Sequence, residues 1–172
     1  PVRVHSGPSL NNFRTVTTED VRRVLTSTPA KSSPLDIVPA SLMKSCANAF
    51  APIIARLANL SFSEGYFPSR YKIAQVLPLL KKPNADRSSP ANYRPISNLA
   101  TISKVLERLA LSQLRPHLLG SSNFCPLQSA YRAGHSTETT LLELLDGVYR
   151  AGDEKQFTVV IGLDISAAFD TI

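Results

Sequence analysis

An apolar, β-branched run that leads into an aspartate is the sequence feature that most restricts how this chain folds. The run occupies residues 157–161, and Asp164 follows it. A short run of this kind predicts a buried strand, here at about residues 156–163. A carboxylate at the carboxyl end of such a strand lies where α/β sheets place their ligand sites. Because burying an uncompensated carboxylate is costly, the pattern favours a divalent cation bound to Asp164 over a purely structural cap of the strand.

The remaining segments are mostly helical, and the prolines cluster between them rather than inside periodic stretches, because proline breaks regular structure. Pro78 lies within the second strand-like run and predicts an edge or bulged strand. The order of elements indicates an α/β (α+β) fold. The expected elements are an arm at 1–16, helices at about 17–26, 40–47, 50–65, 97–114 and 136–152, a loop at 27–39, and strands at about 72–80 and 156–163.

Local signals predict where several helices begin, end and bury their apolar sides. Thr17, with Asp20 three residues later, matches a capping box at the start of the first helix. Gly65 predicts the end of one helix and Pro116 the end of another. The apolar stripe expected at 50–65 consists of Ile53, Ile54, Leu57, Leu60 and Ser61. The one expected at 97–114 consists of Ile102, Val105, Leu106, Leu109 and Leu114.

Basic residues are concentrated in the middle of the chain. The formal net charge is +6, but residues 65–135 carry ten basic side chains against two acidic ones, and residues 136–172 carry two against seven. A basic region beside an acidic one suits a polyanion held against metal-binding carboxylates. The alternative is a solvated basic surface without a partner. No membrane-spanning apolar stretch is present, and Cys46 and Cys125, isolated from other zinc ligands, are expected to be buried thiols.

Lys81, Lys82 and Arg94 flank a polar loop and form a candidate phosphate clamp. The strand that ends near Leu80 and the helix expected from about Ser97 can converge at this loop. Arginine binds phosphate through two parallel hydrogen bonds, and a neighbouring lysine adds charge. The alternative is that Arg94 bonds only to backbone carbonyls of its own turn.

Residues 128–136 form a second candidate site just before the amino end of a helix, where phosphate binds readily. Its aromatic member, Tyr131, could stack on a base. His135 has no serine and carboxylate partners for a hydrolytic triad and is interpreted as a turn residue. Further on, Asp170 suits a helix start or an ion pair as well as chemistry, and Phe169 by itself suits a core position.

Three sequence blocks occur in a fixed order along the chain. They read NYRPISNL with SKVLER at 92–99 and 103–108, QSAYRAGHSTET at 128–139, and LDISAAFD at 163–170. Together they resemble the reverse transcriptase domain of non-LTR (LINE-type) retrotransposons, with the LINE-2, CR1 and jockey groups the most similar. The resemblance extends over roughly residues 30–172.

The resemblance implies a partial right-hand polymerase fold, with helix-rich fingers at about 30–155 and the start of the palm at about 156–172. The implied activity is RNA-directed DNA polymerisation, in which a primer 3′-hydroxyl attacks the α-phosphate of a deoxynucleotide at a site with two Mg²⁺ ions. The implied partners are an RNA template, a DNA primer and deoxynucleotides, with no membrane. The implied location is intracellular, in the ribonucleoprotein of the element.

Matched position by position, the resemblance also implies roles for single residues. Asp164 is the catalytic and metal-binding aspartate, and the backbone carbonyl of Ile165 is a further metal ligand. Phe169 matches the gate that excludes a ribose 2′-hydroxyl. The nucleotide-binding positions are Lys81, Lys82, Arg94, Ala167 and Phe169. The template- and primer-binding positions are Gln128, Ser129, Tyr131 and Arg132.

The family's second catalytic motif, an aromatic residue followed by Ala-Asp-Asp, does not occur in the 172 residues. We therefore expect a fold truncated before the catalytic hairpin. Incubation of this polypeptide with primed RNA, Mg²⁺ and deoxynucleotides should give no extension. The alternative function is a non-catalytic nucleic-acid-binding module derived from such an element. A phosphotransferase with Asp164 as its nucleophile is disfavoured, since the sequence lacks the nearby second aspartate and the phosphate-binding loop of such enzymes.

Overall fold

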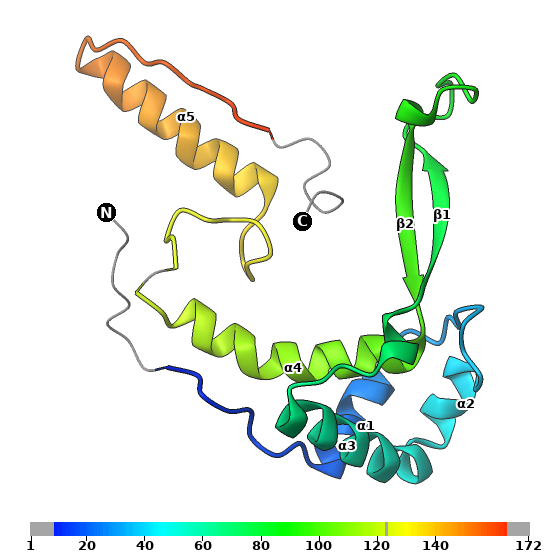
Figure 1. Cartoon of the computed structure of the whole chain (residues 1–172). Coiled ribbons are helices and arrows are strands. Elements are labelled where there is room, and N and C mark those ends of the chain that lie inside the picture. The colour runs from blue at the N-terminus through cyan, green and yellow to red at the C-terminus, as the bar shows by residue number, and fades with distance from the viewer. Residues whose placement is uncertain (1–8, 123, 165–172) are drawn as a thin grey trace. The chain divides into compact units, whose positions relative to one another are not determined.

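The described part of the chain contains five α-helices, two short 3-10 helices (Ser69–Lys72 and Pro90–Asn92) and one two-stranded antiparallel sheet, so the expected mixture of α and β structure is confirmed. The computed structural model describes residues 9–122 and 124–164. The chain divides into two units, residues 1–123 and 124–172. The first contains α1 (Thr18–Ser27), α2 (Ala40–Ser45), α3 (Ala47–Glu64), β1 (Ala74–Leu80), β2 (Tyr93–Leu99) and α4 (Thr101–Leu119), and the second contains α5 (Thr137–Asp153) (Figure 1).

Helices α1, α3 and α4 pack on one another around the core of the first unit. The buried face expected for α1 is confirmed, because Val21 and Leu25 are both buried. On α4, the expected residues Val105, Leu106 and Leu109 are buried in the same cluster. Full burial of a side chain of this size contributes roughly 1.5–3 kcal/mol. These contacts therefore hold the three helices together.

Small residues form much of the buried face of α3. The helix begins at Ala47, a few residues before the expected start, and Ala51 and Ala58 are fully buried. Ile53 and Leu60, both expected in the buried stripe, are 67% and 48% exposed. The expected stripe was therefore wrong at these two positions, because it gave priority to large side chains, and right at Ile54 and Ser61, which are buried. Alanines allow α3 to approach its neighbours closely, and the face that they define is the one that becomes buried.

The segment Tyr93–Leu99 is a strand and not the beginning of a helix. It pairs antiparallel with β1, and α4 begins only at Thr101. The helix start expected near Ser97 was wrong because local spacing carries no information about the partner strand. Pro116 also lies inside α4 and does not stop it. Because it falls in the last turn, only the end of the helical hydrogen-bond ladder is affected.

Two prolines face each other across the hairpin. Pro78 of β1 is opposite Pro95 of β2. Beyond the strand ends, the Lys81 N–H donates to the Asn92 carbonyl at 2.8 Å. Hydrogen-bonded and non-bonded pairs alternate along antiparallel strands, so the proline pair occupies a non-bonded position. At such a position the N–H would point away from the partner strand, so its absence in proline leaves the hydrogen bonds of the hairpin intact. The outer edges of the hairpin lack these donors, which hinders pairing with further strands and agrees with the expected edge strand.

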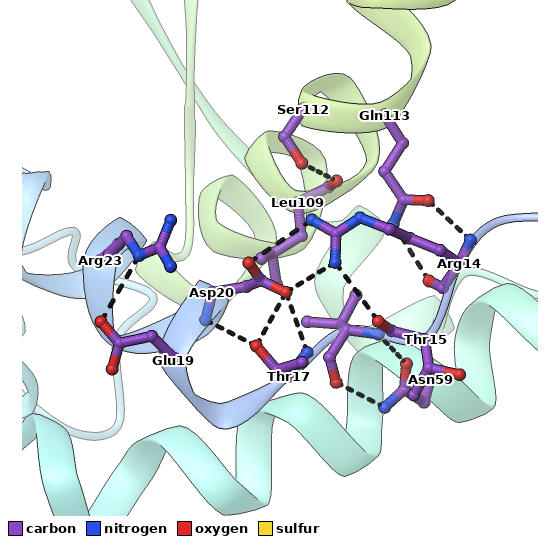
Figure 2. Close-up of polar contacts among 11 residues, drawn as sticks. Arg14, Thr15, Thr17, Glu19, Asp20, Arg23, Asn59, Leu109, Ser112 and Gln113 are labelled. Carbon is purple, nitrogen blue, oxygen red and sulfur yellow. Dashed lines mark hydrogen bonds and ion pairs between the residues drawn. The ribbon is translucent and has the colours of Figure 1, made fainter.

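Side-chain amides fasten the segment before α1 to two helices (Figure 2). Asn59 of α3 accepts from the Val16 N–H at 2.7 Å and donates to the Val16 carbonyl at 2.9 Å. Gln113 of α4 bonds to the N–H and carbonyl of Arg14 in the same way, at 2.7 and 3.2 Å. The amides thus satisfy backbone groups that no helix or strand satisfies. This described part of the expected arm is therefore attached to the helical core.

Asp20 connects the same segment to α1 (Figure 2). Its N–H donates to the Thr17 hydroxyl at 3.1 Å, and the Thr17 N–H donates to its carboxylate at 3.0 Å, which confirms the expected capping box. Arg14 Nη1 lies 2.8 Å from Asp20 Oδ2. The hydrogen bond from Arg14, followed by that from the Thr17 amide, holds the pKa of Asp20 well below its usual value. Asp20 is therefore a stabilising carboxylate at the amino end of α1.

We expect Asp20→Asn to remove part of the acid sensitivity of the fold. Because the folded pKa of Asp20 is depressed, its contribution is complete above the unfolded-state pKa of about 3.9 and is lost as the pH falls below it. The variant should lose about 1 kcal/mol of unfolding free energy at neutral pH. Its stability should also fall less steeply in acid. Urea titrations at several pH values measure both effects, and identical pH slopes for the variant and the wild type would contradict the assignment.

A carboxylate far away in the sequence caps α4. The N-cap residue Ala100 provides no side-chain acceptor. Asp36, in the expected loop after α1, accepts from the Thr101 N–H at 2.6 Å and from the Thr101 hydroxyl at 2.7 Å. It also accepts from the Ser33 N–H at 2.7 Å. Thr101 is 3% exposed, so water does not replace these bonds easily. Asp36 therefore ties the loop to the start of α4.

In the second unit, α5 begins at a reciprocal cap. The Thr139 N–H donates to the Ser136 hydroxyl at 3.2 Å, and the Ser136 N–H donates to the Thr139 hydroxyl at 2.9 Å. The hydrogen bond from Ser136 is also the main reason that the pKa of Glu138 is lowered. The helix ends at Asp153, next to the expected exit at Gly152. Both expected ends of this helix are thus confirmed.

Residues 156–164 form no strand in the structure. The side chains of this segment are exposed, with Phe157 at 101% and Leu163 at 93%. The buried strand expected at 156–163 was therefore wrong. A strand needs hydrogen bonds to a neighbour and a surface to cover its apolar side. Among the described residues, β1 and β2 pair only with each other, so this run has no partner.

Candidate nucleotide and nucleic-acid site

One face of the hairpin presents Arg94 beside apolar side chains. Arg94 is opposite Leu79, and Leu77 is opposite Ile96. Opposed residues share a face and successive residues alternate between faces, so Lys81 continues the same face beyond Leu79. Leu77, Leu79 and Ile96 are between 42% and 55% exposed. This face therefore combines positive charge with accessible apolar surface, the combination that contacts phosphates and bases.

The three cations of the predicted clamp differ in their bonding. Lys81 Nζ donates to the Ala91 carbonyl at 2.7 Å and closes the loop of the hairpin. Lys82 and Arg94 are exposed, and neither side chain forms a hydrogen bond or ion pair with a residue that the structure describes. The alternative in which Arg94 bonds to carbonyls of its own turn is therefore not observed. Its guanidinium remains available for a phosphate.

Asp86 organises the loop between the two strands. Its carboxylate accepts from the Ser88 N–H at 2.9 Å and from the Ser88 hydroxyl at 2.8 Å. The Ser88 amide is the main reason that the pKa of Asp86 is lowered. Asn92 donates to the Asp86 carbonyl at 2.9 Å, and the Tyr93 hydroxyl donates to the Arg87 carbonyl at 3.0 Å. These bonds position the strand ends that carry Lys81 and Arg94.

In the second unit, the predicted template contact Arg132 bonds to its own loop. Its Nη1 donates to the Pro126 carbonyl at 2.6 Å and to the Gln128 carbonyl at 3.4 Å. The guanidinium also lies over the ring of Phe124, at 5.6 Å from the ring centre. These contacts give Arg132 a structural role in the loop. A contact with a nucleic acid remains a prediction for this residue.

The same loop directs an aromatic side chain outward. Tyr131 is 86% exposed and has a φ of 61°, a conformation that side chains larger than glycine rarely adopt. Gln128 donates to the Ala130 carbonyl at 3.3 Å, and Ser129 is half-buried. His135 lies 3.0 Å from the Ala133 carbonyl, as suits a turn residue. Tyr131 is thus the member of this set best placed to meet a base.

Asp164, the predicted metal ligand, is exposed at the end of the described residues. Ile165, Ala167 and Phe169, predicted as metal ligand, nucleotide contact and sugar gate, lie outside the described residues. Within the described residues, no group of three or more histidine, cysteine or acidic side chains could hold a metal ion. Mg²⁺ is bound through several oxygen ligands. Asp164 has suitable chemistry but does not by itself form a magnesium site.

The exposure of the two cysteines differs from the expectation. Cys46 and Cys125 were expected to be buried, and both are exposed free thiols. The expectation was wrong because each lies outside the apolar cluster of the first unit. No helix of the described residues is sufficiently long and apolar to cross a bilayer.

Sequence reasoning missed three cations that line one cavity of the first unit, Lys31, Lys104 and Arg108. The spacing of Lys104 and Arg108 places them on one face of α4, which is a signal that could have been used. Lys31 comes from a distant loop and gives no comparable signal. Asp36 was missed for the same reason, since Thr101, the residue that it caps, lies 65 residues away in the sequence.

The second strand of the hairpin, the loop before α5 and the segment that contains Asp164 all lie in a region that matches one protein family. Residues 80–172, more than half of the chain, match the family described as reverse transcriptase (RNA-dependent DNA polymerase). The chain therefore belongs to the reverse transcriptase family. The matched region begins at the last residue of β1 and includes Arg94, residues 128–132 and Asp164.

The relatives of the chain come from non-LTR retrotransposons, as the sequence blocks predicted. The chain is 29% identical over 161 residues to a probable RNA-directed DNA polymerase from transposon BS of Drosophila melanogaster, covering 93% of this chain and 18% of the relative. It is 35% identical over 107 residues to a probable RNA-directed DNA polymerase from transposon X-element of the same organism, covering 62% of this chain and 12% of the relative. It is 27% identical over 158 residues to the RNA-directed DNA polymerase from mobile element jockey, also of D. melanogaster, covering 91% of this chain and 17% of the relative. The chain thus spans less than a fifth of each of these relatives.

Proposed function

We propose that this chain forms the fingers and the start of the palm of a right-hand RNA-directed DNA polymerase encoded by a non-LTR retrotransposon. In the intact protein it binds an RNA template, a DNA primer and a deoxynucleotide, inside the cell. The observation that carries this proposal is the hairpin face at the start of the matched region, where the Arg94 guanidinium has no bonded partner among the described residues. The guanidinium can hold phosphate oxygens, and the exposed leucines beside it can contact the sugar or base.

In the proposed reaction, the primer 3′-oxygen forms a bond to the α-phosphorus, and the bond to the leaving pyrophosphate breaks. Arg94 holds the triphosphate, Tyr131 contacts the template, and Phe169 contacts the sugar. Asp164 and the Ile165 carbonyl would hold Mg²⁺, which when bound stabilises the charge on the reacting oxygens. The remaining metal ligands belong to the intact parent protein.

Neutralising the clamp should weaken binding to nucleic acid. We expect a variant with Lys81→Gln, Lys82→Gln and Arg94→Gln to bind a labelled RNA–DNA hybrid roughly 100-fold less tightly at low salt. The slope of log affinity against log salt concentration should become shallower by about 2–3, since each lost phosphate contact reduces counterion release. Fluorescence anisotropy at several salt concentrations measures both quantities.

A matched control removes the same charge elsewhere. Arg22 and Arg23 lie on the exposed side of α1 and pair with Glu19, and Lys155 follows α5. Replacing these three cations by glutamine should leave the salt slope almost unchanged. An equal effect of the two triple variants would count against the clamp.

Primer extension separates the two candidate functions. The polymerase proposal predicts that a longer parent polypeptide extends a primer on RNA and that Asp164→Asn abolishes this extension without abolishing binding. A parent polypeptide that binds the hybrid but never extends the primer would favour the non-catalytic binding module.

A further inference from the structure

A cavity of about 530 Å³ opens at the base of the hairpin in the first unit. Its walls come from the loop after α1, from Leu77 and Asn98 of the two strands, and from the first turns of α4. Three cations line it, Lys31 from the loop and Lys104 and Arg108 from α4. The two α4 residues are four positions apart, so one face of this helix forms the wall.

No carboxylate lines this cavity, and no ion pair joins its cations to a residue in the described part of the chain. Lys104 and Arg108 repel each other on their shared helix face. Asp36, the acidic group bonded at the start of α4, is occupied by the Thr101 and Ser33 donors and lines a different cavity. Positive charge gathered in a concave site without a counter-charge attracts an anion.

One of the three cations is held in position. Arg108 Nη1 donates to the Thr28 hydroxyl at 2.9 Å, and that hydroxyl donates to the Val24 carbonyl at 2.7 Å. Thr28 is 8% exposed, so the anchor is shielded from water. The other N–H groups of Arg108 have no acceptor among the described residues. The guanidinium is thus oriented in advance for an additional acceptor such as a phosphate oxygen.

The cavity continues the hairpin face that carries Arg94. Leu77 and Asn98 line the cavity and belong to the same face as Leu79 and Arg94, because residues two positions apart along a strand share a face. Asn98 and Arg94 lie four positions apart along β2, a span of roughly 13 Å. A polymer with phosphates at regular intervals can contact both places at once, whereas an isolated phosphate occupies only one.

On the basis of the proposed function, we propose that this cavity is a second phosphate site, which holds the sugar-phosphate backbone of a single nucleic-acid strand lying along the hairpin face. Lys31, Lys104 and Arg108 pair with its phosphates. Because these contacts go to phosphates and not to base edges, binding at this site is independent of sequence.

The test uses the whole chain and a short labelled oligouridine RNA. A variant with Lys31→Gln, Lys104→Gln and Arg108→Gln should bind roughly 10- to 100-fold less tightly at low salt, with a salt slope shallower by about 2. Lys31→Gln alone should reduce the slope by about 0.7. Lys31 is exposed and has no bonded partner among the described residues, so this single variant retains the fold even if the triple variant does not.

Four outcomes decide the result. The triple variant at Arg22, Arg23 and Lys155 should match the wild type, and an equal loss of binding there would overturn the site. If the wild type fails to bind RNA, the proposed function itself fails. If the triple variant at Lys81, Lys82 and Arg94 binds RNA less tightly while Lys31→Gln matches the wild type, only the second phosphate site is overturned. Competition by thymidine triphosphate that disappears in Lys31→Gln would identify a free nucleotide as the occupant and would also overturn the strand proposal.

Discussion

Replacing Leu106 with alanine is expected to lower the free energy of unfolding of the first unit by about 2–5 kcal/mol. Leu106 is 0% exposed and lies in the cluster where α4 meets α1 and α3. The substitution removes apolar atoms from contact and leaves a cavity that these helices can fill only partly. Urea unfolding followed by circular dichroism measures the loss.

The matched control is Leu111→Ala on the same helix. Leu111 is 52% exposed, so its truncation should change stability by no more than about 0.5 kcal/mol. A small domain is stable by only about 5–15 kcal/mol, so Leu106→Ala can leave it largely unfolded. Leu106→Met, which nearly preserves volume and costs less than about 1.5 kcal/mol, then remains measurable. Equal effects at Leu106 and Leu111 would contradict the packing described for α4.

Replacing Asp36 with alanine is expected to lower the free energy of unfolding of the first unit by about 2–3 kcal/mol. The carboxylate accepts two hydrogen bonds from Thr101 and one from Ser33. Hydrogen bonds to a charged acceptor are stronger than neutral ones, and the donors that remain after its removal are poorly solvated. Because Asp36 caps α4 from a distant loop, the loss should appear as lower stability and as faster hydrogen exchange at the start of α4.

Two variants test whether the cap explains this loss. Asp36→Asn retains one carbonyl acceptor and should cost about half as much as Asp36→Ala. Asp153→Ala removes an exposed carboxylate that forms no hydrogen bond with a described residue, and it should change the free energy of unfolding by less than about 0.5 kcal/mol. Unchanged hydrogen exchange at Thr101 in Asp36→Ala would show that the cap contributes little.

The hairpin illustrates where sequence reasoning succeeds and where it stops. The run at β1 was recognised as an edge strand from its apolar residues and Pro78. The strand Tyr93–Leu99 was not recognised, since its ladder depends on a partner about 20 residues earlier. The reverse error occurred at 156–163, where strand propensity is strong but no described strand pairs with the run. Pairing is a property of two segments, so one segment does not reveal it.

The candidate sites show the same difference between local patterns and contacts between distant segments. Arg94, Lys81 and Tyr131 were selected from local patterns, and the structure shows how each is presented. The second phosphate site was not found, because Lys31 reaches Lys104 and Arg108 only after the loop that follows α1 packs beside α4. A cluster assembled from distant segments has no signature in any single window of sequence.

By itself, the sequence determined the family, the capping of α1 and α5 and the buried side of α1, because these depend on residue types within one or two helical turns or on blocks in a fixed order. The tertiary structure decided which face of α3 is buried, which run pairs with β1, and which distant acid caps α4. It also decided which cations share a cavity. These features depend on which segments meet in space, and the free energy that selects them comes from packing and desolvation between elements.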